Sequence, residues 1–547
     1  MVAKQSKPKA DLEDLWQLVG GFGRYPILLT IFMMYVTIVV SFHTFIQTFY
    51  GTAPNYECVS NEPNNTSSCP VNKCGCQNCT YVFAEEFTSA VSEWNLICTR
   101  GHLKAMTQAV FMAGLLIGSV GFGKFSDHFG RKPTTFVSLI LMALFGFGST
   151  FANSLTLFAV MRFGSGLSTS GSMLVKFVYC MEISRLPQRT SMGIICNLFV
   201  AIGAMLLTLL AYCLPEWRDL MLAVTLSGIP GILLWRWFPE SPRWLIAKGK
   251  LKEAQTVFES FASTNSVQVD SNQIASTIQD IKNAESHTFI KTDKKSMTGI
   301  LDLVRTPKMR KRSLVLAYNW FVNSVIFYGI TLNAKNLGGS LYLNAFILFG
   351  VGIPSILLLW YVLKRLGRRI CYCLFMLLGG IACAMVIAVP GTSGDHPAVK
   401  ALAIIGNFCI IATFSGVYIY NLELSPTLLR NLSLGVGSML SRVGGIVAPY
   451  VVFLNDIMQN LPLVIFGVMA FIAGTTALLL PETLFSSMPQ TVQQVESWDE
   501  DYSVPWRRRR HRDQVSKNVT KEGEADDLIN GNILDNSMDL YFRETTV

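Results

Sequence analysis

Long, nearly uncharged apolar blocks divide this chain, and they limit its possible folds more than any other feature. A block of about 18 or more apolar residues can cross the hydrocarbon core as a helix, which satisfies its own backbone groups there. We therefore expect an all-α membrane protein with twelve transmembrane helices. The predicted spans are Ile27–Tyr50, Leu103–Phe122, Thr134–Ala152, Leu155–Met181, Met192–Cys213, Leu220–Phe238, Leu314–Leu332, Leu341–Leu363, Ile370–Val389, Val399–Leu422, Leu432–Phe453 and Leu461–Leu480.

Polar segments divide the chain into regions. The prediction is a cytoplasmic N-terminus (1–24), a first six-helix half (25–238), a cytoplasmic loop (239–313), a second half (314–481) and a largely disordered cytoplasmic tail (482–547). A basic cluster in that tail, Trp506–Arg512, is compatible with anionic lipid, with a retention signal or with a solvated charge run.

Charge predicts the orientation. The loops after the second, sixth and eighth spans carry most of the lysine and arginine, and basic loops stay in the cytoplasm. Both termini are then cytoplasmic, and the segment 51–102 lies outside. The net charge of +9 therefore indicates contact with membrane lipid rather than with nucleic acid.

The outer segment is rich in cysteine. Of 13 cysteines, six lie there: Cys58, Cys69, Cys74, Cys76, Cys79 and Cys98. In an oxidising compartment they predict up to three disulfides, although Cys74, Cys76 and Cys79 also have spacing suited to zinc. The same segment has three glycosylation acceptors: Asn64, Asn65 and Asn78.

Three motifs recur at an offset of about 240 residues, which predicts two six-helix halves of like topology. The pairs are Gly130-Arg131-Lys132 with Gly367-Arg368-Arg369, Glu182-x-Ser184 with Glu423-x-Ser425, and Pro239-Glu240-Ser241 with Pro481-Glu482-Thr483. Carboxylate–guanidinium pairs at such helix ends are expected to gate the cytoplasmic side, beyond anchoring the helices. The expected gating residues are Asp127, Arg131, Glu182, Arg189, Glu240, Arg368, Glu423, Arg430 and Glu482.

Three basic residues lie inside predicted spans, where charge is costly and indicates function. Arg442 lies mid-span among small residues, which favours a role in a substrate cavity. Lys176 is six residues before Glu182, so both a cavity role and extension to the cytoplasmic interface stay open. Arg162 lies near the start of the fourth span.

Several motifs resemble those of one transporter family. Gly121–Lys132 (GFGKFSDHFGRK) resembles the signature loop of major facilitators, and Ser92–Cys98 resembles the segment before the second span in solute carrier family 22. Pro239–Leu245 and Glu423–Asn431 are similar to segments of the same family. The resemblance extends to about Pro489. It implies the major facilitator fold and an organic cation, organic anion or carnitine-type zwitterion as substrate.

The resemblance also implies functions for particular residues. Asn319–Gly339 and Ser441–Tyr450 are most similar to invertebrate organic-cation-type and carnitine-type members. Arg162 matches a family position with a gating or coupling role. Aromatic faces attract organic cations, although a single aromatic in a span more often only packs. The implied pocket residues are Met173, Phe177, Trp320, Asn323, Phe327 and Tyr328.

The chain departs from the family pattern at charged positions. Arg442 stands where vertebrate cation transporters of the family carry an acid, and Gly352 where many members carry glutamate. A tyrosine of the family is Ser425 here. Because anionic groups are missing and cationic ones present, a substrate carboxylate is favoured.

We therefore expect a polyspecific organic ion transporter of the plasma membrane that favours carnitine-like zwitterions. A plain organic anion transporter is the alternative, and a non-transporting sensor is the alternative class. We find no nucleophile–base or metal-binding constellation in the sequence, so we expect neither an enzyme nor a cofactor. Sodium, protons or an exchanged substrate remain open as coupling partners.

Overall fold

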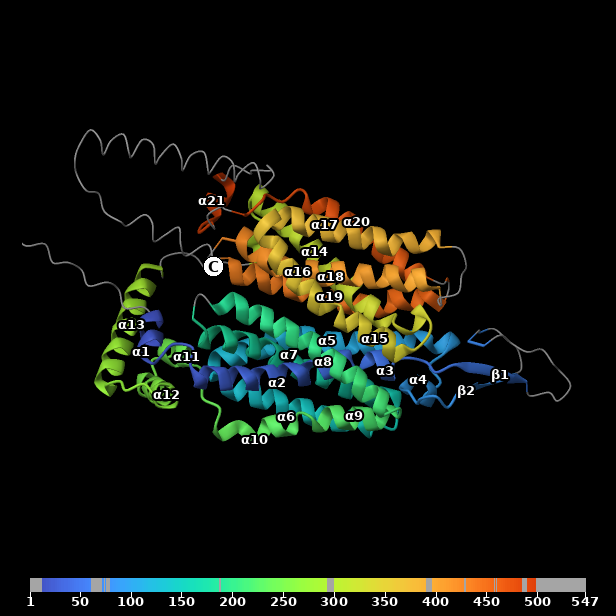
Figure 1. Ribbon diagram of the computed structural model, residues 1–547, viewed down its shortest axis with the longest axis horizontal. Coiled ribbons are helices and arrows are strands. Elements are labelled where there is room, and N and C mark those ends of the chain that lie inside the picture. Colours follow the sequence, from blue (N-terminus) through green and yellow to red (C-terminus); the bar gives the residue numbers. More distant parts are fainter. Residues whose placement is uncertain are drawn as a thin grey trace, which may run out of the picture.

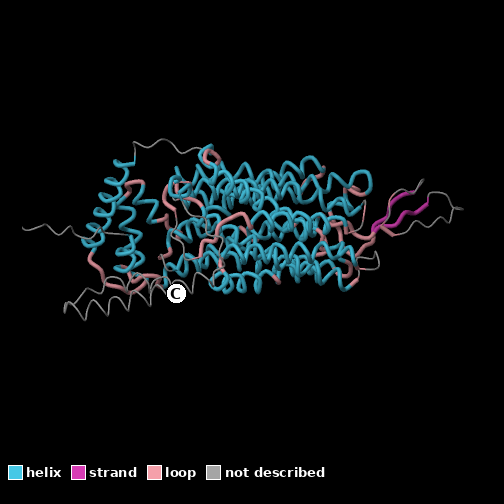
Figure 2. Tube along the Cα trace, turned by 90° about the horizontal axis from the view of Figure 1, so that it is seen from above, coloured by secondary structure: helices cyan, strands magenta, loops and turns pink. Residues whose placement is uncertain are grey.

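The computed structural model describes residues 12–60, 71–72, 74, 79–185, 188–292, 300–389, 396–426, 429–456, 458, 460–484 and 489–497. Within these residues the protein is helical except for one hairpin (Figures 1 and 2). Asn64, Asn65, Asn78, Cys69, Cys76 and the basic cluster Trp506–Arg512 lie outside the described residues.

The membrane helices fall into two sequential groups, which Figure 1 shows as two layers. The first half comprises α2 (Arg24–Phe45) continued by α3 (Gln47–Tyr50), α5 (Gly101–Phe129), α6 (Arg131–Thr150), α7 (Leu155–Ile183), α8 (Arg189–Cys213), α9 (Trp217–Leu226) and α10 (Ile229–Leu233). The second half comprises α14 (Pro307–Leu332), α15 (Leu341–Gly350), α16 (Gly352–Leu366), α17 (Arg368–Ala384), α18 (Pro397–Leu424), α19 (Arg430–Phe453) and α20 (Leu461–Ala477). Short helical segments join them: α4 (Ala90–Glu93), η1 (Cys98–Arg100), η3 (Leu234–Arg236), η4 (Ile300–Leu303), η5 (Lys335–Leu337), η6 (Met385–Ala388) and η7 (Leu454–Asp456).

The predicted twelve-helix plan is confirmed. Ten spans in the described residues are long and apolar enough to cross a membrane by length and composition alone. The remaining two are α7, whose Arg162, Lys176 and small polar residues lower its hydropathy, and α20, which has only 17 residues. Helices extend past the apolar blocks; the run Arg310–Arg312, expected in a loop, lies in α14.

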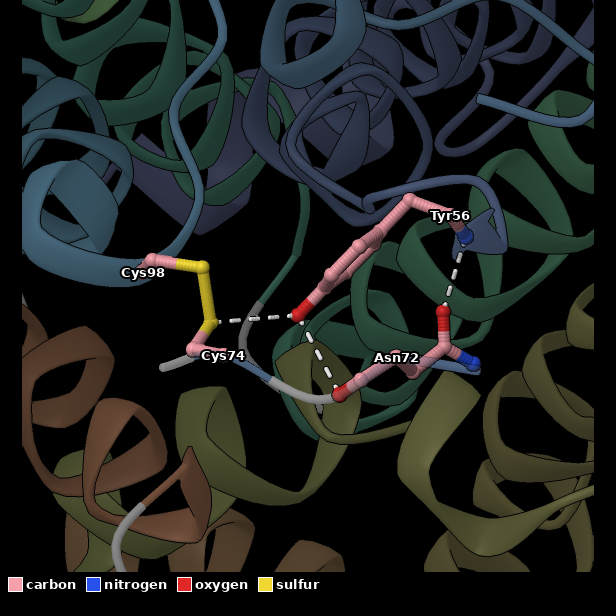
Figure 3. The surroundings of a disulfide bond; sticks show 4 residues. All are labelled: Tyr56, Asn72, Cys74 and Cys98. Atoms are coloured by element: carbon pink, nitrogen blue, oxygen red, sulfur yellow. Dashed lines mark hydrogen bonds between the residues drawn. A yellow bond between two sulfur atoms is a disulfide. The ribbon is translucent and has the colours of Figure 1, made fainter. Parts of the chain in front are cut away.

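The bundle has two distinct ends. The basic end carries Arg131, Arg368 and the polar helices described below, whereas the disulfide end carries the hairpin (Figure 1). The hairpin joins β1 (Tyr56–Ser60) antiparallel to β2 (Cys79–Phe83), with Tyr56 opposite Phe83. Cys74 and Cys98 form a disulfide beside it, and the Tyr56 hydroxyl lies 3.5 Å from the Cys74 sulfur (Figure 3). Cys58 is disulfide-bonded as well.

The polar segments 1–24 and 239–313 contain four helices at the basic end, which the sequence analysis did not predict. They are α1 (Leu12–Leu18), α11 (Pro242–Ala247), α12 (Leu251–Thr264) and α13 (Ser271–Thr292). Trp16 of α1 packs against Phe258 and Phe261 of α12, with ring centroids 5.4 and 5.2 Å away. Their amphipathic sequences are too polar for a membrane span, yet they bury a shared apolar face.

Ordered structure continues beyond Pro481 into the predicted tail 482–547. Glu482 is buried, and α21 (Val492–Ser497) packs Val495 against Leu303 and Met309. The carboxylate of Glu496 accepts hydrogen bonds from the backbone N–H groups of Lys308 and Met309, at 2.9 and 3.2 Å. The α21 helix thus caps the first turn of α14.

The two halves share a core at only one end. One large hydrophobic cluster draws buried residues from both halves and includes Phe45, Met112, Tyr328 and Phe349. Toward the basic end, separate clusters belong to the first half with its polar helices, or to the second half. Among the described residues, the halves are therefore packed together toward the disulfide end and have separate cores at the basic end.

Candidate functional site

A charged cluster closes the basic end of the first half. The Arg131 guanidinium contacts Glu182 of α7, with Nη2 2.8 Å from Oε1 and Nε 3.2 Å from each carboxylate oxygen. Its Nη1 also lies 2.9 Å from Asp127 Oδ1. Sequence placed these three residues at one surface, and the structure joins them into one network that ties α5, α6 and α7 together.

Glu240 caps the start of α6. Its Oε1 accepts hydrogen bonds from the backbone N–H groups of Arg131 and Ser241, both at 2.8 Å. Burial raises the pKa of Glu240, although these backbone donors act in the opposite direction. The carboxylate approaches so closely because position 130 is glycine: a Cβ there would lie 2.1 Å from Glu240 Oε2.

The second half repeats this arrangement. Arg368 Nη2 lies 2.9 Å from Glu423 Oε1, and the Arg368 N–H donates to Glu482 Oε1 at 2.8 Å. Gly367 precedes α17 with φ +86°, as Gly130 precedes α6 with φ +110°. The Thr483 hydroxyl adds a bond to Glu423 Oε2 at 2.5 Å. The two halves thus have matching charged networks as well as matching motifs.

Two tyrosines belong to these networks, and sequence reasoning missed them. The Tyr179 hydroxyl donates to the Pro239 carbonyl at 3.2 Å, and the Tyr420 hydroxyl to the Pro481 carbonyl at 2.8 Å. Each tyrosine lies three residues before the glutamate of its half. This equal spacing in the two halves could have identified both tyrosines from the sequence.

The ion pairs found in these networks lie within one half, not between the halves. Arg189 and Arg430 begin α8 and α19 at the same end. Arg162 must be separated from the group, because it lies about 30 Å along α7 from Glu182. It is fully buried, 4.3 Å from the Phe111 ring centroid, and donates to the His43 carbonyl at 3.3 Å.

Arg442 and Lys176 belong to different halves and lie close enough for their charges to interact. Both are buried, at 7% and 5% exposure. Arg442 Nη2 lies 3.3 Å from the Met173 sulfur, so α19 contacts α7 here. Lys176 Nζ has no hydrogen-bond partner, and neither cation forms an ion pair with any described residue.

Aromatic rings surround the neighbouring space from both halves. Phe327 stacks on Phe414 with centroids 5.7 Å apart, and Phe45 of the first half lies 6.0 Å from Phe327 and 6.4 Å from Tyr328. The Tyr418 ring centroid lies 4.3 Å from that of Trp320, and Tyr418 interacts electrostatically with Arg442. Phe45, Phe414 and Tyr418 were not predicted, since nothing distinguishes them among the 35 phenylalanines and 17 tyrosines.

Asn323 and Trp320 lie inside the second half and not in the expected pocket. The Asn323 amide donates to Tyr372 Oη at 2.6 Å and accepts from Thr413 Oγ1 at 2.6 Å, all inside the second half. Trp320 is fully buried in the same half. Both pack the half internally in this conformation, whereas Phe177, one turn beyond Met173 on α7, is 43% exposed.

Two matched six-helix halves that share a core at one end, and bring buried charges together between them, define a secondary transporter. The sequence matches the "Sugar (and other) transporter" family over residues 75–493. It is 37% identical over 423 residues to an organic cation transporter protein of Drosophila melanogaster, covering 77% of each chain. It is 35% identical over 489 residues to a solute carrier family 22 member 15-like protein of Xenopus laevis, covering 89% of this chain and 96% of the relative.

Solved structures agree in fold. The inward open conformation of the xylose transporter XylE from E. coli matches with a TM-score of 0.60 at 14% identity, covering 86% of this chain and 99% of the other. The chain belongs to solute carrier family 22 of the major facilitator superfamily. It is therefore a multi-pass membrane transporter of small organic ions and not an enzyme.

Proposed function

We propose that this transporter favours small organic ions that carry a carboxylate, above all carnitine-like zwitterions. The observation that carries the proposal is the pair Lys176 and Arg442, two buried cations without an acidic partner in the described residues. A buried unpaired charge is strongly unfavourable, so such a pair requires an anion or water. A carboxylate offers two oxygens and fits the guanidinium fork of Arg442.

The distribution of acids supports the same conclusion. Within the described membrane helices, aspartate and glutamate occur only close to helix ends, at Asp127, Glu182, Asp219 and Glu423. A permanent cation entering the centre would meet Lys176 and Arg442 without a compensating carboxylate. The match to an organic cation transporter names a relative's substrate, and the charges at the centre of this chain argue for a different preference.

An amine on the same substrate would have its own surface. Tyr418 interacts electrostatically with Arg442, and its ring continues through Phe414 to Phe327 and Tyr328. Aromatic faces attract ammonium groups by about 0.5–2 kcal/mol, depending on desolvation. A zwitterion can therefore place its carboxylate on Arg442 and its ammonium on the rings. Plain organic anions satisfy only the first of these contacts, which makes them the second candidate.

Alternating access fits the arrangement of the halves. We propose that the basic end faces the cytoplasm, with both termini, since basic loops remain inside. The conformation described is then open inward, because the shared core lies toward the disulfide end. The charged networks around Arg131 and Arg368 would keep each half rigid while the halves rock, with Arg189 and Arg430 at the same ends.

The test is uptake into oocytes of radiolabelled L-carnitine, benzoate and tetraethylammonium, with wild type and Arg442→Asp. We expect carnitine uptake, with benzoate second, and loss of at least nine-tenths of it in R442D. The matched control is Arg305→Asp, because Arg305 is an arginine with an 81% exposed side chain. Surface expression is measured for each variant.

Two results would contradict the proposal. Uptake of tetraethylammonium that R442D preserves or improves would make Arg442 structural and the protein a cation carrier. Saturable binding of carnitine without any uptake would instead identify a sensor on a transporter scaffold.

A further inference from the structure

Thr306 precedes α14 at the N-cap position but does not cap the helix. Its backbone is extended, with φ −103° and ψ 151°, and its side chain accepts no hydrogen bond from the helix. An N-cap side chain ordinarily accepts from the second or third backbone N–H of its helix, which here belong to Lys308 and Met309. Glu496 of α21 accepts from both of these donors. A carboxylate from another helix therefore occupies the place of the Thr306 side chain.

The Thr306 hydroxyl is left unengaged by this arrangement. Its oxygen is buried and forms no hydrogen bond with a described residue, although the Glu496 carboxylate lies beside it. The flanking residues are open to solvent, since Arg305 has an 81% exposed side chain and Pro307 is exposed. Withdrawal of Glu496 together with the short helix α21 would open that side of the hydroxyl.

Thr306 also lies directly before a proline and between basic residues, in the sequence Arg305–Lys308 (RTPK). Three hydroxyl residues of the chain precede a proline, and the other two are Ser241 and Ser425. Both serines are buried, at 0% and 2% exposure, and the hydroxyl of each takes part in a hydrogen bond. Among these three sites, Thr306 alone combines exposed flanks with an unengaged hydroxyl.

We propose that Thr306 is a phosphorylation site, and that its phosphate competes with the Glu496 carboxylate for the start of α14. A protein kinase would transfer the γ-phosphoryl group of ATP to Thr306 Oγ1. The new O–P bond replaces the bond from the γ-phosphorus to the bridging oxygen, ADP leaves, and the hydroxyl proton is released to solvent. The inference goes beyond the proposed transport and requires only that the basic end faces the cytoplasm, where ATP is available.

A phosphate on Thr306 would favour its own helix over α21. It carries about two negative charges and three acceptor oxygens, and a helix N-terminus attracts such a group. From the N-cap position these oxygens reach the Lys308 and Met309 N–H groups, which now donate to Glu496. The phosphate and the carboxylate also repel each other. Phosphorylation is therefore expected to expel the Glu496 carboxylate.

Loss of the Glu496 contact would release α21 from two membrane helices at once. Val495 packs in one cluster with Met309 of α14 and with Leu429, which directly precedes α19. The α21 helix has only six residues, too few to be stable without such contacts. Phosphorylation would thus remove a contact that joins the basic ends of α14 and α19.

The experiment uses the purified full chain in lipid nanodiscs, with magnesium ATP and a proline-directed protein kinase of the mitogen-activated class. Mass spectrometry of tryptic peptides measures phosphate at Thr306. We expect Glu496→Ala to speed the modification about tenfold or more, because two charge-assisted hydrogen bonds that hold α21 are lost. Gln493→Ala, at an exposed position of the same helix, is the matched control and should keep the wild-type rate. Thr306→Val should remove the signal and so verifies its assignment.

Hydrogen exchange of the phosphorylated wild type then tests the competition. We expect exchange in α21 to rise to the rate seen in E496A without phosphate, whereas exchange in α16 should stay unchanged. A rise confined to α21 and the start of α14 separates release of this helix from unfolding of the half.

Three results would overturn the inference in different places. Absence of phosphate at Thr306 in both wild type and E496A would overturn the modification site. Equal rates in wild type and E496A would overturn the shielding by Glu496, and phosphate that leaves exchange in α21 unchanged would overturn the competition. None of these measurements involves a transported substrate, so each leaves the proposed carboxylate preference untouched.

Discussion

At the scale of single residues, the most constrained positions are glycines that let a carboxylate reach a helix start. Gly130 has φ +110° and ψ 172°, a conformation that side chains rarely adopt, and its missing Cβ makes room for Glu240. Gly367 also has a positive φ, +86°, directly before Arg368, where Glu482 caps α17. These glycines explain in physical terms why both halves carry a Gly-Arg-basic motif.

Gly130→Ala is therefore expected to destabilise the protein. Backbone strain of this kind costs about 1–3 kcal/mol, and the added methyl would also displace the cap on α6. The measurement is the melting temperature of purified protein in detergent, with Gly123→Ala as control, because no atom lies within 4 Å of a Cβ at Gly123. Equal melting of the two variants would show that the close approach of Glu240 is unimportant.

At the scale of elements, α21 links the chain beyond the last span to the start of the second half. Glu496 holds the first turn of α14, and Val495 fills the contact with Leu303 and Met309. Desolvation opposes ionisation of Glu496, but hydrogen bonds from the Met309 and Lys308 backbones prevail and hold its pKa below the usual range. The carboxylate therefore stabilises this contact.

Glu496→Ala is expected to increase hydrogen exchange in α21 and in the first turn of α14. Gln493→Ala, an exposed position on the same helix, is the control and should leave exchange unchanged. Because the folded pKa of Glu496 is depressed, its contribution is present above the unfolded value and is lost as the pH falls through the folded value. The difference between wild type and E496A should therefore shrink at acidic pH; a difference that grows there would contradict this account.

Sequence predicted the membrane helices and the paired motifs well, because apolar length and recurring charge are local signals. It missed α1, α11–α13 and α21, whose short amphipathic faces acquire meaning only when packed together. It predicted Arg442, Met173, Lys176 and Asn323 in one site, and the structure brings Arg442 into contact with Met173. A polar residue in a span can contact substrate or hydrogen-bond to other residues of its own half. For Asn323 the sequence does not distinguish these roles, and the structure shows hydrogen bonds to Tyr372 and Thr413.

At the scale of the whole molecule, the arrangement of charge is uneven across the bundle. Acids and bases pair at the basic end, whereas the helix interiors hold Arg162, Lys176 and Arg442 and, among the described residues, no acid. Arg162 lies between aromatic rings in the first half and donates to a carbonyl. Arg442 contacts Met173 of the first half, and we propose that the charges of Lys176 and Arg442 serve the substrate.

The most direct test compares L-carnitine with its methyl ester as inhibitors of labelled carnitine uptake. The two molecules share the ammonium and the hydroxyl, and only the acid carries a carboxylate. Charge-assisted bonds contribute about 1.5–3 kcal/mol, which corresponds to roughly tenfold or more in affinity. The account predicts that the acid inhibits wild-type uptake at least tenfold more strongly than the ester. An ester that inhibits as well as the acid would contradict it.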